Sequence, residues 1–220
     1  MARDRGGGAQ LALPLDGKPA YGRDDFLVAD CNRAALAWIE AWPDWPGRLA
    51  VLAGPEGSGK THLAHIWCRL AGARTVAAGR LDLDSVGGAP LAVEGIDAAP
   101  DDTVLLHALN RIAEAGGHVL ATARLAPGYW RGRLPDLVSR LRAAPTVEIG
   151  RPDDALIEAV LRKLFRDRQI EVRGEAVEFL LRHMERSLEA ARRTVAEADR
   201  LALAERRPVT IPLLRRVLGS

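Results

Sequence analysis

Short apolar runs alternate with helix-like stretches between Tyr21 and Gly150. Five runs have the length and apolar character of buried strands: Leu49–Ala53, Thr75–Ala78, Pro90–Val93, His118–Thr122 and Thr146–Ile149. The clearest helix between them is Asp101–Gly116, whose apolar side chains recur at helical spacing: Val104, Leu105, Leu109, Ile112 and Ala113. Because strands alternate with helices, we predict an α/β domain over residues 21–150, with a parallel sheet covered by helices on both faces.

Beyond Arg151-Pro152 the pattern becomes helical throughout. Asp153 or Asp154 is suited to cap a helix whose apolar residues repeat every three or four positions: Leu156, Val160, Leu161, Leu164 and Phe165. Further helices are predicted over Glu175–His183 and Leu188–Glu205, and Thr210 is expected to cap a last one, which carries Pro212 in its first turn. We therefore predict a small all-helical domain over residues 151–220. Residues 1–20, rich in Gly, Pro and Ala, predict a flexible arm.

Composition narrows the class of protein. The 220 residues contain no apolar run of about 18, and the charged start leads into no uninterrupted apolar segment, so we expect neither a membrane span nor a signal peptide. Cys31 and Cys68 form no C-x-x-C pair and are expected to be reduced thiols of a cytoplasmic protein. The formal net charge is only +2, and acids interleave with the arginines of the C-terminal third, which does not favour a basic groove for nucleic acid.

The strongest chemical signal is Gly54-Pro55-Glu56-Gly57-Ser58-Gly59-Lys60-Thr61, a G-x-x-x-x-G-K-T loop. It stands between the predicted strand and a predicted helix over His62–Leu70, so successive N–H groups and a helix N-terminus point at one place. Lys60 is expected to reach the β- and γ-phosphates of a nucleotide, and Thr61 to offer its hydroxyl to Mg²⁺. His62, the next residue, is included in the predicted nucleotide site. The alternative is a chance glycine-rich turn.

A phosphate loop followed by a helical lid resembles the AAA+ superfamily, and the details resemble its DnaA branch and, within it, the Hda family, from Gln10 to Leu218. The resemblance implies a bacterial, replisome-associated cytoplasmic protein that binds ADP or ATP with Mg²⁺. It also implies nucleotide-dependent dimers. The chain ends just after the predicted lid, where DnaA continues into a DNA-binding helix-turn-helix domain, so we expect DNA contact only through partners.

The second acidic motif of this family matches Leu91-Ala92-Val93-Glu94-Gly95-Ile96-Asp97. Glu94 matches the acid near Mg²⁺, but Gly95 stands where the resemblance requires the acid that polarises the attacking water. Loss of that base predicts intact binding and impaired hydrolysis. Asp97 is a candidate substitute, and side-chain alternation keeps it on the Gly95 side only if the strand stays extended.

Three arginines match family positions around the nucleotide. Arg124, in Thr122-Ala123-Arg124, resembles the sensor-1 segment, and Arg186 resembles the sensor-2 arginine of the lid. Arg140, in Leu134-Pro135-Asp136-Leu137-Val138-Ser139-Arg140, resembles the arginine finger that acts in trans on a neighbour's nucleotide. The alternatives are surface arginines for the first two and a local ion pair with Asp136, four residues earlier on one helix, for Arg140. Tyr21 and Phe26 match a segment that lies beside the adenine ring.

The hexapeptide Gln10-Leu11-Ala12-Leu13-Pro14-Leu15 is similar to the motif by which Hda docks on the replication sliding clamp, the β subunit of the polymerase. Gln10 offers an amide, Leu11, Leu13 and Leu15 suit apolar pockets, and Pro14 reduces the freedom lost on binding. An arm folded back on its own core is the alternative. Trp38, Trp42 and Trp45 are expected to pack over the sheet edge rather than stack on nucleic acid.

Together these features predict a negative regulator of replication initiation that binds the clamp and an adenine nucleotide and stimulates hydrolysis of DnaA-bound ATP through Arg140. Two other functions stay open. A self-sufficient ATPase, acting as a motor or loader, requires turnover by the isolated protein, which Gly95 argues against. A DNA-binding initiator paralogue requires salt-dependent affinity for duplex DNA.

Overall fold

A five-stranded parallel sheet forms the centre of the first part of the chain in the computed structural model, which describes residues 21–219. The strands are β1 (Leu49–Ala53), β2 (Arg74–Ala77), β3 (Leu91–Glu94), β4 (Val119–Ala123) and β5 (Thr146–Glu148). Their order in the sheet is β2-β3-β4-β1-β5, with every neighbouring pair parallel. The predicted clamp-binding residues Gln10, Leu11, Leu13, Pro14 and Leu15 lie outside the described residues.

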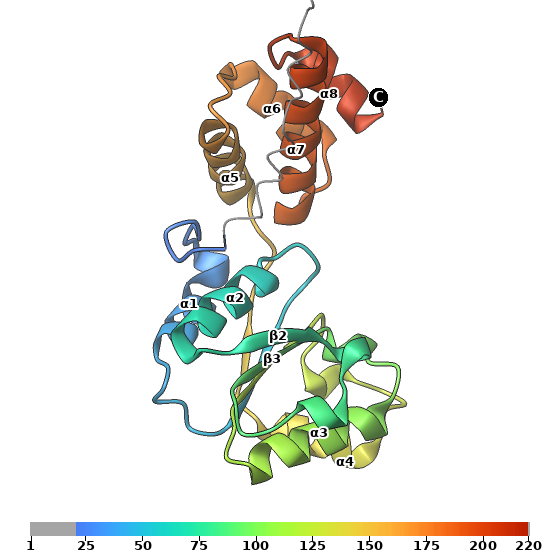
Figure 1. The fold of residues 1–220 in the computed structure, drawn as a ribbon. Coiled ribbons are helices and arrows are strands. Elements are labelled where there is room, and N and C mark those ends of the chain that lie inside the picture. Colours follow the sequence, from blue (N-terminus) through green and yellow to red (C-terminus); the bar gives the residue numbers. More distant parts are fainter. Residues whose placement is uncertain (1–20, 220) are drawn as a thin grey trace, which may run out of the picture.

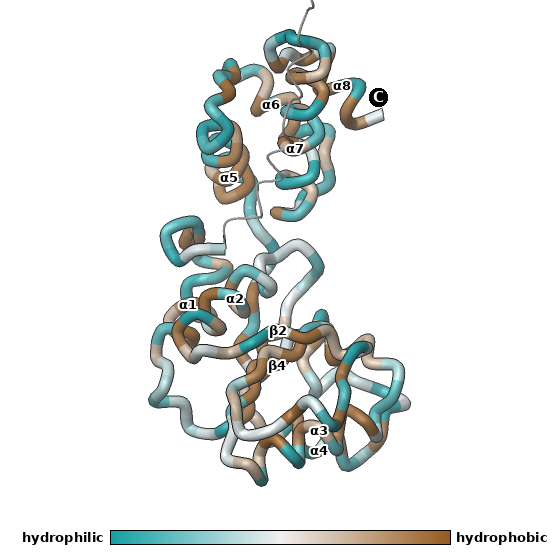
Figure 2. The backbone as a smooth tube through the Cα atoms, in the orientation of Figure 1, coloured by the Kyte–Doolittle hydropathy of each residue, from teal (hydrophilic) through white to brown (hydrophobic). Residues whose placement is uncertain are grey.

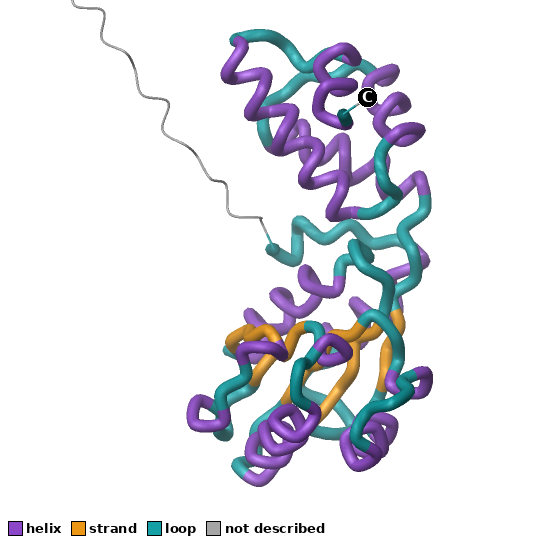
Figure 3. Tube along the Cα trace, turned by 90° about the vertical axis from the view of Figure 1, so that its right-hand side faces the viewer, coloured by secondary structure: helices purple, strands orange, loops and turns teal. Residues whose placement is uncertain are grey.

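Helices cover both faces of the sheet, as predicted (Figures 1 and 3). The helices are α1 (Asp30–Glu40), α2 (Lys60–Ala71), α3 (Asp102–Glu114) and α4 (Pro135–Ala143). The strand residues Ala50, Leu52 and Leu120 pack with α1 and α2 in one apolar cluster. Val51 and Ala121, their neighbours along the strands, pack with α3 and α4 in the other. This alternation is what buries both faces of a central strand.

Four single-turn 3₁₀ helices punctuate the loops of the sheet region: η1 (Ala78–Arg80), η2 (Leu83–Ser85), η3 (Ile96–Ala98) and η4 (Pro127–Tyr129). The tryptophans before β1 pack as predicted. Trp45 stacks on Trp67 of α2 with ring centroids 5.3 Å apart, and Trp42 meets Trp67 edge to face at 5.4 Å. No helix within residues 21–219 is long and apolar enough to cross a bilayer.

Four helices form a separate bundle that stands above the sheet region in Figure 1: α5 (Asp154–Asp167), α6 (Gly174–His183), α7 (Leu188–Glu205) and α8 (Ile211–Leu218). Asp153 supplies the α5 cap, since its Oδ1 accepts the Leu156 N–H at 2.8 Å. Hydrophobic residues follow the inner stretches of these helices in Figure 2, and the largest buried side chain among them is Phe165.

A short extended segment before α1 joins the two parts of the molecule. Leu27, Ala29 and Cys31 pack against the apolar cluster of the helical bundle, while Phe26 belongs to the cluster under α1 and α2. The carbonyl of Cys31 accepts the Gly150 N–H at 2.8 Å, where the chain leaves the sheet. The helical bundle therefore completes its core with residues that precede the sheet in sequence.

Candidate functional site

The loop Gly54–Gly59 follows β1 at the edge of the sheet where the parallel strands end. Since β1 lies between β4 and β5, this is the point at which the strand order reverses, the usual ligand position in such sheets. Gly57 and Gly59 have φ values of +70° and +104°, which favour glycine. A Cβ on Gly54 would lie 2.6 Å from the carbonyl oxygen of Ile149. The glycines are thus required by the shape of the loop, before any ligand is considered.

Lys60 opens α2 and turns back over the loop. Its Nζ donates to the carbonyl oxygens of Gly54 and Pro55, both at 2.7 Å. An ammonium has three protons, so one remains for an anion inside the loop. Burial, together with the nearby Arg124, lowers the pKa of Lys60 below its usual value, while nearby carboxylates oppose that effect. The arrangement is a half-buried cation suited to receive negative charge.

Glu94, the last residue of β3, fits the predicted Mg²⁺ role. Its Oε1 is buried and has no hydrogen-bond partner among the described residues, and it lies close enough to Lys60 to raise the pKa of that amine. Thr61 is exposed in the first turn of α2. Mg²⁺ in nucleotide sites is held by one or two protein oxygens and by phosphates, so a hydroxyl and a lone carboxylate suffice. The donor set therefore fits magnesium with a nucleotide.

The strand does not stay extended at the position of the missing acid. Gly95 is left-handed, with φ +69° and ψ +44°, and its N–H donates to Thr122 Oγ1 at 3.1 Å. The chain then turns into η3, which carries Asp97. Asp97 Oδ2 accepts the backbone N–H of Arg124 at 3.1 Å, directly after β4. The extended strand that alternation required is absent, yet Asp97 reaches the same edge of the sheet by a turn.

Arg124 lies beside the loop, and its sensor-1 role stays a prediction. Its guanidinium forms an ion pair with Glu56 of the loop at 3.2 Å, with both side chains about two-thirds exposed. An exposed pair of this kind is worth little in stability. Arg124 is therefore free to exchange Glu56 for a more negative ligand.

The helical bundle rests directly on the loop. Leu188 N donates to the carbonyl oxygen of Gly57 at 3.0 Å, and Ser187, which caps α7, occupies the space where a Gly57 side chain would stand. Leu188 also lies near Gly59, as does Phe26. The first turn of α7 thus closes one side of the loop.

His62 connects the bundle to the sheet region a second time. Its Nε2 lies 2.8 Å from the carbonyl oxygen of Gly22, and its Nδ1 lies 3.1 Å from Nη2 of Arg192 in α7. Both contacts are satisfied by a neutral ring that donates from Nε2 and accepts at Nδ1. Burial and, to a lesser degree, Arg192 lower the pKa of His62 below its usual value. The predicted base-contact residue Tyr21 stacks on His65, with ring centroids 4.4 Å apart.

Arg186 has a different partner from the predicted one. Its guanidinium pairs with Asp154 at 3.0 Å and is 69% exposed. Asp154, Arg186 and Met184 line an open hollow of about 540 Å³ on the bundle. Ser187, the residue after Arg186, touches the loop at Gly57, but the Arg186 side chain itself is held by Asp154, and the sensor-2 role stays a prediction.

Arg140 lies at the other end of the sheet. It lines a cavity of about 250 Å³ together with Leu49 and Val119, which begin β1 and β4. Its Nη2 lies 3.4 Å from the carbonyl oxygen of Leu109, its Nε is buried without a partner among the described residues, and no ion pair joins it to Asp136 within that part of the chain. The five residues of β1, at about 3.3 Å each, separate it from its own loop by roughly 16 Å.

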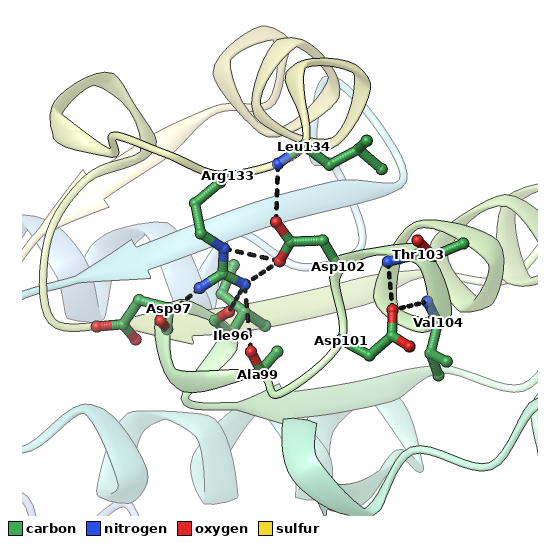
Figure 4. A network of polar contacts seen from close by, with 9 residues as sticks. All are labelled: Ile96, Asp97, Ala99, Asp101, Asp102, Thr103, Val104, Arg133 and Leu134. Carbon is green, nitrogen blue, oxygen red and sulfur yellow. Dashed lines mark hydrogen bonds and ion pairs between the residues drawn. The ribbon is translucent and has the colours of Figure 1, made fainter.

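Sequence reasoning missed a polar network between η3 and α4 (Figure 4). Arg133 donates from Nε to Asp102 at 2.7 Å and from Nη1 to the carbonyl oxygen of Asp97 at 2.7 Å, and Asp102 also accepts the Leu134 N–H at 2.8 Å. Burial opposes ionisation of Asp102, but these hydrogen bonds hold its pKa below its usual value. The only signal in the sequence was an arginine two residues before Pro135, the proline that opens α4.

Comparisons with known proteins agree with this geometry. Residues 153–218 match the family of Hda lid domains. The fold resembles domain III of the replication initiation protein DnaA from Thermotoga maritima, with a TM-score of 0.77 and 16% identity over 92% of this chain and 97% of that one. It also resembles AMPPCP-bound DnaA from Aquifex aeolicus (TM-score 0.66, 17% identity, 86% of this chain and 66% of that one). The RuvB Holliday junction branch migration motor of Thermotoga maritima matches with a TM-score of 0.69 and 16% identity, over 90% and 71% of the two chains.

Proposed function

We propose that this chain, which has the AAA+ fold of the DnaA branch and a lid of the Hda family, is a negative regulator of replication initiation. It binds an adenine nucleotide in the Gly54–Thr61 loop, docks on the sliding clamp through Gln10–Leu15, and supplies Arg140 to the ATP of DnaA. The observation that carries this proposal is the position of Arg140, remote from the loop of its own chain and beside a cavity at the opposite end of the sheet. An arginine at this position can contact the nucleotide of a partner protein but not the nucleotide of its own chain.

The nucleotide site of this chain organises the lid. Lys60 and the loop amides bind the phosphates, and Thr61 and Glu94 would hold Mg²⁺, which supplies charge neutralisation there. Because Gly57 carries the contact to Leu188, a change in loop shape reaches α7 directly. We propose that ADP is the resting ligand, and that Tyr21, Phe26, Arg124 and Arg186 complete its surroundings.

The partner's reaction needs a cation at the right place. When water attacks the γ-phosphorus of DnaA-bound ATP and the bond to the β-bridging oxygen breaks, negative charge spreads over the transferred group. The Arg140 guanidinium neutralises that charge, an effect worth about 10³–10⁵ in rate for such arginines. Its half-buried position and weak contact with Leu109 leave it free to be drawn toward a phosphate.

The decisive experiment measures DnaA–ATP hydrolysis with and without DNA-loaded clamp, in the presence of purified full-length protein. Arg140→Ala is expected to abolish stimulation while clamp and nucleotide binding stay unchanged. Arg142→Ala is the matched control, because Arg142 lies on the same helix and is exposed. Stimulation retained by Arg140→Ala, or lost equally in both variants, contradicts the finger assignment.

Two binding measurements test the other parts. Gln10→Ala is expected to weaken binding to the purified clamp, with Gln169→Ala as a control of the same residue type; unchanged affinity removes the docking proposal. Lys60→Ala is expected to weaken ADP binding at least about tenfold, since it removes the ammonium that the loop holds. An unaltered dissociation constant contradicts the nucleotide assignment.

A further inference from the structure

The sequence lacks an acid at position 95, but Asp97, two residues later, lies at the end of the neighbouring strand β4. We infer that Asp97 orients and deprotonates the attacking water when this chain hydrolyses its own bound ATP. This inference rests on the proposed nucleotide site. It gives the chain an ATPase activity of its own, in addition to the proposed action of Arg140 on the ATP of DnaA.

The backbone brings Asp97 to the loop through a short series of hydrogen bonds. Asp97 Oδ2 accepts the Arg124 N–H at 3.1 Å, and the preceding residue, Ala123, accepts the N–H of Gly54, the first loop residue, at 3.1 Å. The left-handed Gly95 makes this possible, because it ends β3 and starts the turn into η3. Position 95 therefore lacks a carboxylate, but the turn that Gly95 makes brings the carboxylate of Asp97 to the end of β4.

The carboxylate of Asp97 forms no ion pair with Arg133. Arg133, the nearest guanidinium in the network, binds the carbonyl oxygens of Ile96, Asp97 and Ala99 and the carboxylate of Asp102. In Figure 4 the side chain of Asp97 points away from Arg133. No ion pair to Asp97 is formed within residues 21–219. Arg133 thus fixes the backbone of η3 and leaves the acid free.

The negative charge of Asp97 interacts with Lys60 of the loop. Among the acids that raise the pKa of Lys60, Asp97 has the largest effect, ahead of Glu56 and Glu94. The geometry of the carboxylate rests on hydrogen bonds: Arg124 N–H holds its Oδ2 and Arg133 holds the Asp97 carbonyl, and a rigid support is what an acid needs to hold one water in place.

The proposed step balances without a further reactant. Water gives a proton to the Asp97 carboxylate while its oxygen bonds to the γ-phosphorus. The bond between that phosphorus and the β-bridging oxygen breaks, and its electron pair stays on ADP. Inorganic phosphate leaves, and Asp97 returns its proton to solvent.

The test compares single-turnover hydrolysis of radiolabelled ATP bound to the full chain in three forms: wild type, Asp97→Asn and Asp44→Asn. Asparagine keeps an oxygen that accepts the Arg124 N–H and removes only the negative charge. Asp44 is an exposed acid with no side-chain partner among the described residues, so it controls for net charge. Affinity for ATP with and without Mg²⁺ and the unfolding midpoint are measured on the same samples.

We expect Asp97→Asn to lower the single-turnover rate by about 10² to 10⁴, the usual worth of a general base, with ATP affinity and unfolding midpoint unchanged. Equal rates in Asp97→Asn and wild type overturn the inference. A rate that falls only in proportion to affinity or unfolding midpoint also overturns it, because Asp97 then acts only as support for β4. Wild-type protein that binds Mg²⁺ and ATP without hydrolysis overturns it too, and leaves the proposed regulatory function intact. Absence of nucleotide binding overturns both.

Discussion

The contact between Gly57 and Ser187 gives the sharpest test of how the lid meets the loop. In Gly57→Ala the new Cβ would lie 2.4 Å from the Cβ of Ser187, a distance that real side chains do not adopt. Ser187 cannot turn away alone, since its hydroxyl caps α7 by accepting the Ala190 N–H at 3.0 Å. The bundle must therefore move off the loop.

Three contributions set the expected loss. Alanine in a left-handed conformation costs about 1–2 kcal/mol. Breaking the hydrogen bond from Leu188 to Gly57 costs roughly another 1 kcal/mol, and the displaced packing about 1–3 kcal/mol. The full substitution is thus expected to lower the free energy of unfolding by about 3–6 kcal/mol.

Gly72→Ala separates the backbone cost from the other two contributions. Gly72 is also left-handed, with φ +62°, but a Cβ at this position would meet no atom within 4 Å, so the variant bears only the backbone cost. The loss of glycine's freedom in the unfolded chain is the same in both variants. Urea unfolding at equal m-values gives the difference, which we expect to exceed about 1.5 kcal/mol. Equal losses in the two variants would show that α7 does not rest on the loop in solution.

Three further outcomes follow from contacts described above. Because burial lowers the pKa of His62, and burial with Arg48 lowers that of His118, the unfolded chain takes up protons first. The free energy of unfolding should therefore fall as the pH drops below about 6.5 and level off below the folded-state pKa values, and His62→Gln should reduce this dependence in urea titrations at about pH 7.5 and 5.5. Asp153→Ala, which removes the α5 cap, should cost about 1 kcal/mol in the same assay, and no loss would contradict the cap. Asp102→Ala leaves the Arg133 charge half-buried and unpaired and should cost about 2–3 kcal/mol, whereas a loss below about 0.5 kcal/mol, the size expected at an exposed site, would refute the network.

The strands could be predicted because their signals are local. All five strands begin within one residue of their predicted starts, since each apolar run is bounded by polar or glycine residues. Of the two predicted caps, Asp153 makes its bond, whereas Thr210 stands at the start of α8 but its side chain makes no capping hydrogen bond. The sequence offered Asp153 and Asp154 as caps of α5, and the structure shows that Asp153 is the cap. Helix α1 was not predicted, because its buried stripe is short and consists of Asn32, Ala35, Leu36 and Ile39, which gives only a weak apolar periodicity.

In the candidate site, too, only the residues with local signals could be predicted. Spacing alone places Gly54–Thr61 and Glu94, whose geometry is set by one strand, one loop and one helix. The position of Asp97 depends on a left-handed turn at Gly95 and on hydrogen bonds to β4, which is 27 residues away in sequence. The contact between His62 and Arg192 joins residues 130 apart. Such pairings are fixed by tertiary packing, so a local pattern carries no sign of them.

The segment around Leu27–Cys31 has a consequence for biosynthesis. These residues leave the ribosome early, yet the apolar surface that covers them belongs to helices that are translated last. The sheet region can begin to form during synthesis, but this segment and the ion pair between Asp25 and Lys163, 138 residues apart, must wait until helices of the bundle have been translated. The loop Gly54–Gly59 is therefore covered only once α7 has been made, and a protein truncated before α7 would emerge with this loop uncovered.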